Sequence, residues 1–197
     1  ISGPLFRYFP QGFIYDVQGM SCFFEYTHIY KELAWLNSKV FNEVSKLISP
    51  AGHIQIGEIG KMPACDNCPE GSSELAKQNI SISKSDWDAH ETSWDFTSNE
   101  LLSIDTDSYE SIMHDFADYH QISIDLEPTE PSKLSWRVDI YKKKWETMFL
   151  RLHQNEETLN EKFIHIYSLE NELTPDVPLD EVTILQQGEI SIEKEKT

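Results

Sequence analysis

The feature that most constrains this chain is a helical pattern that runs without interruption over residues 134–174. Its apolar residues alternate at three- and four-residue spacings, as in a heptad seam. They are Val138, Tyr141, Trp145, Met148, Leu152, Leu159, Phe163 and Ile166. The pattern predicts a long helix, or a helical hairpin, whose apolar stripe needs a partner.

Two residues decide how this helix is divided. Asn155 falls on the seam, where it is either a polar core residue that sets register or the N-cap of a second helix beginning at Glu156. Pro175 is expected to end the pattern, because proline has no backbone N–H and disfavours helix in the residue before it.

The N-terminal third predicts strands on either side of a helix. Residues 11–26 mix aromatic and β-branched residues, which favours short strands with a turn at Gln18-Gly19. From His28 the period changes to that of an amphipathic helix, with apolar residues at Leu33, Leu36, Val40, Val44 and Leu47. Residues 53–63 then predict a strand carrying Ile54, Ile56 and Ile59. We therefore expect the α+β class, with a strand-helix-strand unit followed by a mainly helical region.

The middle and the end of the chain give weaker patterns. Residues 64–100 predict loops and short helices, one capped by Ser72 or Ser73 and another by Ser83 or Ser85, the second carrying Asp86 and Asp88 near its N-terminus. The aromatic residues Trp87, Trp94 and Phe96 are expected to dock this acidic segment onto another surface.

Two further elements are expected after residue 100. Residues 107–121 predict a helix with Ile112, Phe116 and Tyr119 on one face. The alternation in residues 182–193 predicts one or two strands.

The charge of −18 is distributed unevenly along the sequence. The balance is 0 over residues 1–61, −14 over 62–132, +4 over 133–151 and −8 over 152–197. The only basic island therefore lies at the start of the long helical pattern, where a phosphate backbone could approach. The segments that we distinguish are 1–66, the α+β unit; 67–132, acidic helices and loops; 133–174, the long helix or helix pair; and 175–197, an extended tail.

Several functional classes lack support. The chain has no Walker A loop, no G-x-G-x-x-G after a strand, no G-x-S-x-G and no H-E-x-x-H, so we predict no catalytic, cofactor or metal residues. Cys65 and Cys68 have the spacing of half a zinc site that Cys22 and His53 would have to complete, but two loop thiols are the favoured interpretation. Three cysteines favour a reducing cytoplasm over a disulfide framework.

Two groups of residues are candidate DNA contacts. On a helix, Arg137, Lys144 and Arg151 recur every seven residues along one side, and Lys142 and Lys143 belong to the same basic island. In the N-terminal helix, the polar run interrupting the apolar pattern is Asn37, Ser38 and Lys39. The alternative for both groups is an ordinary solvated helix face.

Three stretches together resemble one protein family. Residues 33–63 (LAWLNSKVFNEVSKLISPAGHIQIGEIGKMP) resemble the target-recognition part of large bacterial adenine-specific DNA methyltransferases. Residues 82–96 (ISKSDWDAHETSWDF) and 155–175 (NEETLNEKFIHIYSLENELTP) are similar to tracts of the PglX methyltransferases of BREX phage-defence systems. Order and approximate spacing agree too, so the resemblance covers nearly the whole chain. Related type II restriction-modification methyltransferases share part of it.

The resemblance implies an expected function. Such enzymes methylate the exocyclic amine of a flipped-out adenine with S-adenosylmethionine as donor. Their Asn-Pro-Pro-Tyr/Phe and glycine-rich motifs do not occur here, and the chain lacks an initiator Met. We therefore expect the target-recognition and spacer portion of a longer protein in the bacterial cytoplasm, without its own cofactor.

The expected partners are double-stranded DNA and the enzyme's own catalytic domain or other defence subunits, with no membrane. A different class of function remains open, namely an acidic protein-protein interaction module or a DNA mimic without a DNA-reading role.

Overall fold

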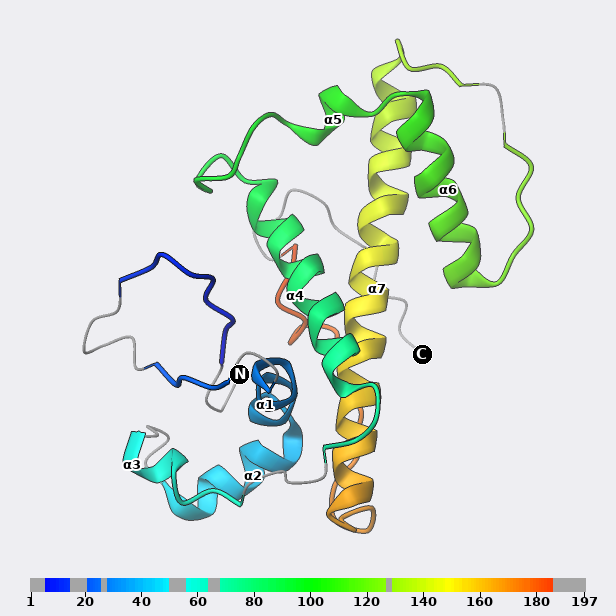
Figure 1. The fold of residues 1–197 in the computed structure, drawn as a ribbon. Helices are drawn as coiled ribbons and strands as arrows, with labels where there is room; N and C mark the ends of the chain where they lie inside the picture. Colours follow the sequence, from blue (N-terminus) through cyan, green and yellow to red (C-terminus); the bar gives the residue numbers. More distant parts are fainter. Residues whose placement is uncertain are drawn as a thin grey trace. The chain divides into compact units, whose positions relative to one another are not determined.

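A computed structural model describes residues 6–14, 21–25, 28–49, 56–63, 68–126 and 129–185, and these contain seven helices and no strand (Figure 1). The helices are α1 (Ile29–Leu36), α2 (Lys39–Ile48), α3 (Ile56–Ile59), α4 (Ser72–Asp88), α5 (Glu100–Ser103), α6 (Thr106–His120) and α7 (Leu134–Ile166). The expected α+β class is therefore wrong for the part of the chain that the structure describes.

The expected strands do not form in the described residues. Residues 56–59 form the short helix α3, because a short apolar run does not distinguish a strand from a helix. Residues 11–14, 21–25 and 182–185 are irregular, although β-branched and aromatic residues favour strands only where a partner strand accepts them. The other parts of these predictions, including Gln18-Gly19, lie outside the described residues.

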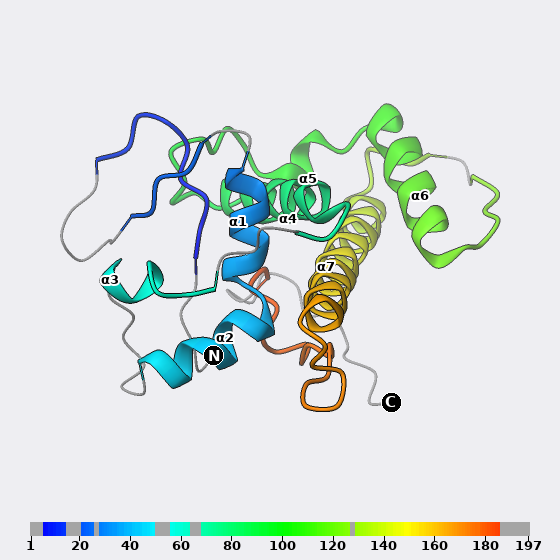
Figure 2. The ribbon, with the colours of Figure 1, turned by 60° about the horizontal axis from the view of Figure 1, so that its bottom comes forward.

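The N-terminal helical pattern is divided in two. Asn37 and Ser38 separate α1 from α2, and the chain bends there (Figure 2). The Ser38 hydroxyl accepts a hydrogen bond from the Phe41 backbone N–H and donates to the Trp35 carbonyl, so it caps α2 while it is itself buried. The break allows the apolar faces of both helices to reach one core.

The two short helices expected over residues 72–88 form the single 17-residue helix α4. Ser83 and Ser85 therefore lie inside the helix and cap nothing. Asp86 and Asp88 lie in its last turn, where the helix dipole disfavours negative charge, whereas the sequence had placed them near an N-terminus.

Helix α6 occupies nearly the range expected from sequence. Asp105 and Ser108 form a reciprocal capping box at its start. At its end Gln121 adopts the left-handed conformation, with φ of 52°, and the Ile122 N–H bonds the Ala117 carbonyl. The buried face carries Tyr109, Met113 and Ala117, offset from the expected face of Ile112, Phe116 and Tyr119.

Helix α7 is continuous through Asn155, which therefore caps no second helix. Its 33 residues make it about 50 Å long at 1.5 Å per residue. It ends at Ile166, well before Pro175, because Ser168 turns left-handed with φ of 55°. The Leu169 N–H then bonds the Ile164 carbonyl at 3.0 Å and the Ser168 N–H bonds that of His165 at 3.1 Å, which is a Schellman ending.

The chain forms two compact units. The first comprises Ile1–Ile80 and Asn155–Val177, and the second comprises Ser81–Gln154 and Pro178–Thr197. The division falls inside α4 and α7, so each helix contributes to both units. Among the described helices, none combines the length and the apolar composition that a membrane crossing requires.

Each unit has its own apolar core, and each takes part of the α7 stripe. In the first unit Phe163 and Leu159 pack with Trp35 and Phe41, and the Trp35 ring stacks on Tyr167 at 4.9 Å. The second core contains Ile104, Tyr109, Met113, Ile140, Tyr141 and Trp145. The partner that the stripe was expected to need is thus supplied, within each unit, by other helices of the chain.

Candidate functional site

The basic island lies on α7 in the second unit, and its first member is held by backbone oxygens. The Arg137 guanidinium donates from Nε to the Pro131 carbonyl at 2.6 Å. From Nη1 it donates to the carbonyls of Leu101 and Leu102 at 3.1 and 2.9 Å. These two residues belong to α5, so Arg137 ties α5 and the start of α7 together through the fixed fork of its donors.

Two lysines of the island also contact neighbours in the second unit. Lys144 Nζ lies 2.8 Å from Glu100 Oε1, and both side chains are largely covered, with 23% and 27% exposed. Lys143 Nζ lies 5.6 Å from the centre of the Phe116 ring, within reach of a cation–π contact. Lys144 is therefore paired with a carboxylate, whereas the ammonium group of Lys143 makes no described hydrogen bond.

The remaining two cations of the basic island have fewer polar contacts. Lys142 is exposed and Arg151 is half-buried, and neither has a hydrogen bond or ion pair to another described residue. Nine positions separate them, which is two and a half helical turns, so they lie on opposite sides of α7. The sequence placed Arg137, Lys144 and Arg151 on one side of the helix. The first two bond other residues of the second unit, and the Arg151 side chain has no described hydrogen bond or ion pair.

The polar run in the first unit holds the junction between α1 and α2. The Asn37 side chain accepts from the Phe6 N–H at 3.0 Å and donates to the Phe6 and Leu33 carbonyls. The Lys39 N–H donates to Asn160 Oδ1 at 2.9 Å, and its Nζ donates to the Asp176 carbonyl. Ser38 is the buried cap described above. That these residues also contact DNA stays a prediction.

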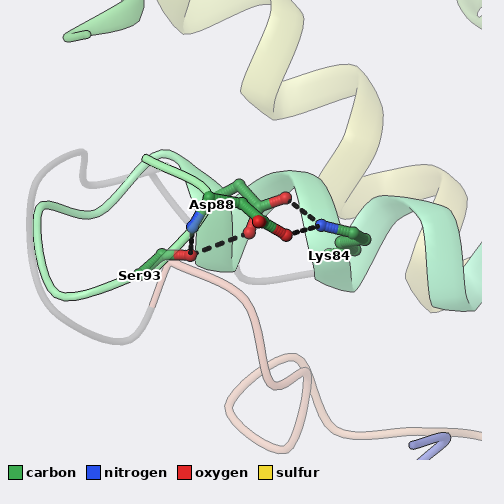
Figure 3. A network of polar contacts seen from close by, with 4 residues as sticks. Lys84, Asp88 and Ser93 are labelled. Carbon is green, nitrogen blue, oxygen red and sulfur yellow. Dashed lines mark hydrogen bonds and ion pairs between the residues drawn. The ribbon is translucent and has the colours of Figure 1, made fainter. Parts of the chain in front are cut away.

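A charged network stands at the end of α4 (Figure 3). Lys84 Nζ contacts Asp88, one turn away, and Asp95 at 2.8 Å. The Ser93 hydroxyl donates to Asp88 Oδ1 at 2.9 Å and accepts from the Asp95 N–H at 3.2 Å. The network closes the turn that follows α4 back onto the helix.

The network shifts the ionisation of its members. Burial acts to raise the pKa of Asp88, but the hydrogen bonds from Lys84 and Ser93 and the charge of Lys84 leave it below its usual value. Hydrogen bonds to Asp88 and Asp95 raise the pKa of Lys84. Both shifts favour the charged pair, which offsets the unfavourable position of Asp88 at a helix C-terminus.

Sequence reasoning missed one polar arrangement and left another as one of two alternatives. The Lys84–Asp88 pair has the i,i+4 spacing of a helix pair, so sequence could have indicated it, whereas the Asp95 contact depends on the turn. Asn155 is buried and donates from Nδ2 to Gln78 Oε1 at 3.3 Å and Asn79 Oδ1 at 2.8 Å. The seam position of Asn155 was the signal, and its polar core role was one of the two expected outcomes.

Metal-binding residues do not gather in the part of the chain that the structure describes. No group of three or more histidine, cysteine or acidic side chains there has the arrangement of a metal site. Cys22 and Cys68 are not joined in a disulfide, and burial raises the pKa of the Cys22 thiol. Cys65 and His53, which a zinc site would need, lie outside the described residues.

Comparison with known proteins yields two curated relatives. Over 183 residues, covering 90% of this chain, it is 31% identical to the adenine-specific methyltransferase PglX of Lacticaseibacillus casei (strain Zhang). Over 99 residues, covering 49% of this chain, it is 40% identical to the adenine-specific methyltransferase BrxX of Escherichia coli O9:H4 (strain HS). The matched regions span only 13% and 8% of those proteins. No family model and no solved structure matches the chain.

Proposed function

We propose, from the relationship of this chain to the BREX-type adenine-specific methyltransferases, that it serves such an enzyme as a target-recognition and spacer region. The observation that carries the proposal is the 31% identity to PglX across 90% of the chain. The chain corresponds to a small share of that protein and has no catalytic motif of its own. Adenine methylation and S-adenosylmethionine binding are therefore assigned to other parts of the enzyme.

Within this region we assign DNA contact to the uncommitted cations of α7. Lys142 is exposed and the Lys143 ammonium makes no described hydrogen bond, whereas Arg151, which also has no described partner, lies on the opposite side of α7 from Lys142 and belongs to a different surface. Such residues can neutralise backbone phosphates, which positions a duplex without reading its sequence. Reading of the target sequence is proposed for residues 1–66, where Asn37, Ser38 and Lys39 remain candidates.

The length of α7 supports the spacer role. A continuous helix of about 50 Å is long compared with an average helix of three to four turns. Its two ends enter different apolar cores, so the helix cannot fray at either end without exposing buried aromatic rings. We propose that this continuous helix serves as the spacer between the recognition module and the rest of the enzyme.

The experiment that tests DNA contact is a pair of matched charge reversals in the full-length methyltransferase. Lys142→Glu should weaken duplex binding and lower the slope of log affinity against log salt by about one, because one phosphate contact is lost. Lys133→Glu is the control, since Lys133 is also exposed in the second unit but pairs with Glu130 at 2.6 Å. Lys144 is unsuitable, because its reversal would also break the Glu100 pair.

The same pair of variants separates the alternative function. If Lys142→Glu and Lys133→Glu have equal affinity and equal salt dependence, these residues do not contact DNA, and the acidic middle of the chain favours a protein-interaction module. Adding Lys143→Glu should deepen the loss if the surface includes this neighbouring lysine, whereas Arg151→Glu, on the opposite side of α7 from Lys142, should add little. A site-specific methylation assay then reports whether the weakened binding reduces target modification.

A further inference from the structure

A fully exposed tryptophan stands on the turn that follows α4. The relative exposure of the residue is 101% for Trp94 and 52% for Trp87, which lies in the last turn of α4. Large aromatic rings left in water are unfavourable in proportion to their apolar area, and they are enriched at the centres of protein interfaces. The position of Trp94 therefore needs a functional explanation.

The turn that carries Trp94 is braced on both sides of the ring. Ser93, which is 8% exposed, bonds Asp88, and Asp95 contacts Lys84 at 2.8 Å (Figure 3). Backbone bonds from Ser93 to His90 and from Phe96 to Ser93 add to this brace. The ring is thus presented by an ordered backbone, which lowers the conformational entropy lost when a partner binds.

The surroundings of the ring are acidic. Residues 85–100 contain five acidic residues and no lysine or arginine. Lys84 pairs with Asp88 and Asp95, and Lys144 pairs with Glu100, so the negative charge on this surface comes from Asp86 and the exposed Glu91. Such a surface repels a phosphate backbone, so stacking on a nucleic-acid base is disfavoured. The same charges attract a protein surface that carries lysine and arginine around an apolar contact.

We propose that the Trp94 turn, residues 87–96, docks into an apolar pocket bordered by basic side chains on another protein module of the methyltransferase. Trp94 fills the pocket, Trp87 adds apolar contact at its edge, and Glu91, which is exposed, faces the basic border. Lys84, Asp88 and Ser93 act as positioning residues that hold the ring outward. The proposal rests on the preceding one only in placing this chain within a longer methyltransferase.

The test replaces Trp94 with photoreactive benzoylphenylalanine in the full-length methyltransferase. Leu47, which is 83% exposed, receives the same replacement as control. After irradiation, peptide mapping should find position 94 joined to a segment of the same enzyme outside this chain that contains lysine or arginine. Glu91→Lys and Lys84→Met, each added separately, should lower the yield several-fold. Circular dichroism verifies that the variants remain folded.

Three results would overturn the proposal. They are cross-linking of position 94 to added duplex DNA, cross-linking to the same turn of a second copy, and a yield no greater than at position 47. The cross-linking experiment and the DNA-binding experiment can fail independently of each other. The Lys142→Glu titration measures salt-dependent affinity for duplex, whereas the cross-link is mapped in the enzyme without DNA.

Discussion

The two units differ in whether ion pairs connect distant segments. In the first unit, distant segments are joined by side-chain amides and by two lysines that donate to backbone carbonyls, Lys39 to Asp176 and Lys162 to Glu70. Asn160 bonds the Lys39 N–H and the Pro175 carbonyl, and Asn155 bonds the amide oxygens of Gln78 and Asn79. The ion pairs described in this unit join residues no more than five positions apart, all with partly exposed side chains.

In the second unit, charged groups connect distant segments. Lys144 reaches Glu100 across 44 positions, Arg137 reaches the carbonyls of α5, and Lys84 reaches Asp95 across the turn. Neutral hydrogen bonds respond little to ionic strength or pH, whereas ion pairs weaken with salt and carboxylates are lost in acid. High salt and acid are therefore expected to weaken the long-range contacts of the second unit more than the amide contacts of the first.

The largest effect should come from removing an aromatic ring from the apolar core of the first unit. Phe163 is completely buried and its ring lies 5.5 Å from that of Trp35. Phe163→Ala should lower the free energy of unfolding by about 3–5 kcal/mol, through lost burial and the cavity left behind. Urea unfolding measured by circular dichroism checks this. Ile166→Ala, at a residue that is 41% exposed, should cost far less.

Asn160→Ala tests the amide chemistry of the first unit. The change leaves the Lys39 N–H and the Pro175 carbonyl without their side-chain partner, at a cost of about 1–3 kcal/mol for buried polar groups. Because the lost bonds are neutral, the cost should be the same in low and high salt. Asn171→Ala, at an exposed asparagine, is the matched control. A cost for Asn160→Ala that falls with salt would contradict the comparison.

Sequence predicted the existence of the long helix α7 and nearly the whole range of α6. The apolar pattern of α7 persists over nine turns, and no strand is consistent with such a period. The strand predicted over residues 53–63 rested on three isoleucines, a run too short to separate strand from helix, and residues 56–59 form α3. The end of α7 at Ser168 was missed, because only tertiary packing places a serine in the left-handed conformation.

The candidate site was predicted less completely than the helix that carries it. Heptad spacing placed Arg137 and Lys144 on one side of α7, but their partners come from Glu100 and the α5 carbonyls, more than 30 positions away. The periodicity of one helix says nothing about which backbone oxygens another segment will present. Local pairs such as Lys84–Asp88 are the exception, since one helical turn fixes their separation.

Lys144→Met tests the ion-pair chemistry of the second unit. It leaves the largely covered carboxylate of Glu100 without its cation, and we expect a loss of about 1–2 kcal/mol in low salt. The loss should shrink as salt screens the pair in the parent protein, in contrast to that of Asn160→Ala. Urea unfolding at two ionic strengths measures both. Lys142→Met is the control and should change stability by less than about 0.5 kcal/mol, because Lys142 is exposed without a described partner.

The smallest effect concerns the response of the second unit to acid. The pKa of Asp88 is held below its usual value in the folded chain, so its stabilising contribution is complete above the ordinary aspartate pKa. It is lost as pH falls through the lowered pKa, because the carboxylate then takes up a proton and releases Lys84.

Asp88→Asn should therefore destabilise the chain by less than about 1 kcal/mol near neutral pH, and this difference should begin to fall below pH ~4 and vanish once pH is below the lowered pKa of Asp88. Urea unfolding of parent and variant across this range gives the difference at each pH. Asp115→Asn, at an exposed carboxyl of α6, is the matched control. If the Asp88→Asn difference stayed constant in acid, the stability of this turn would not depend on the charge of Asp88. The contrast between the neutral amide contacts of the first unit and the ion pairs of the second would then fail at this turn.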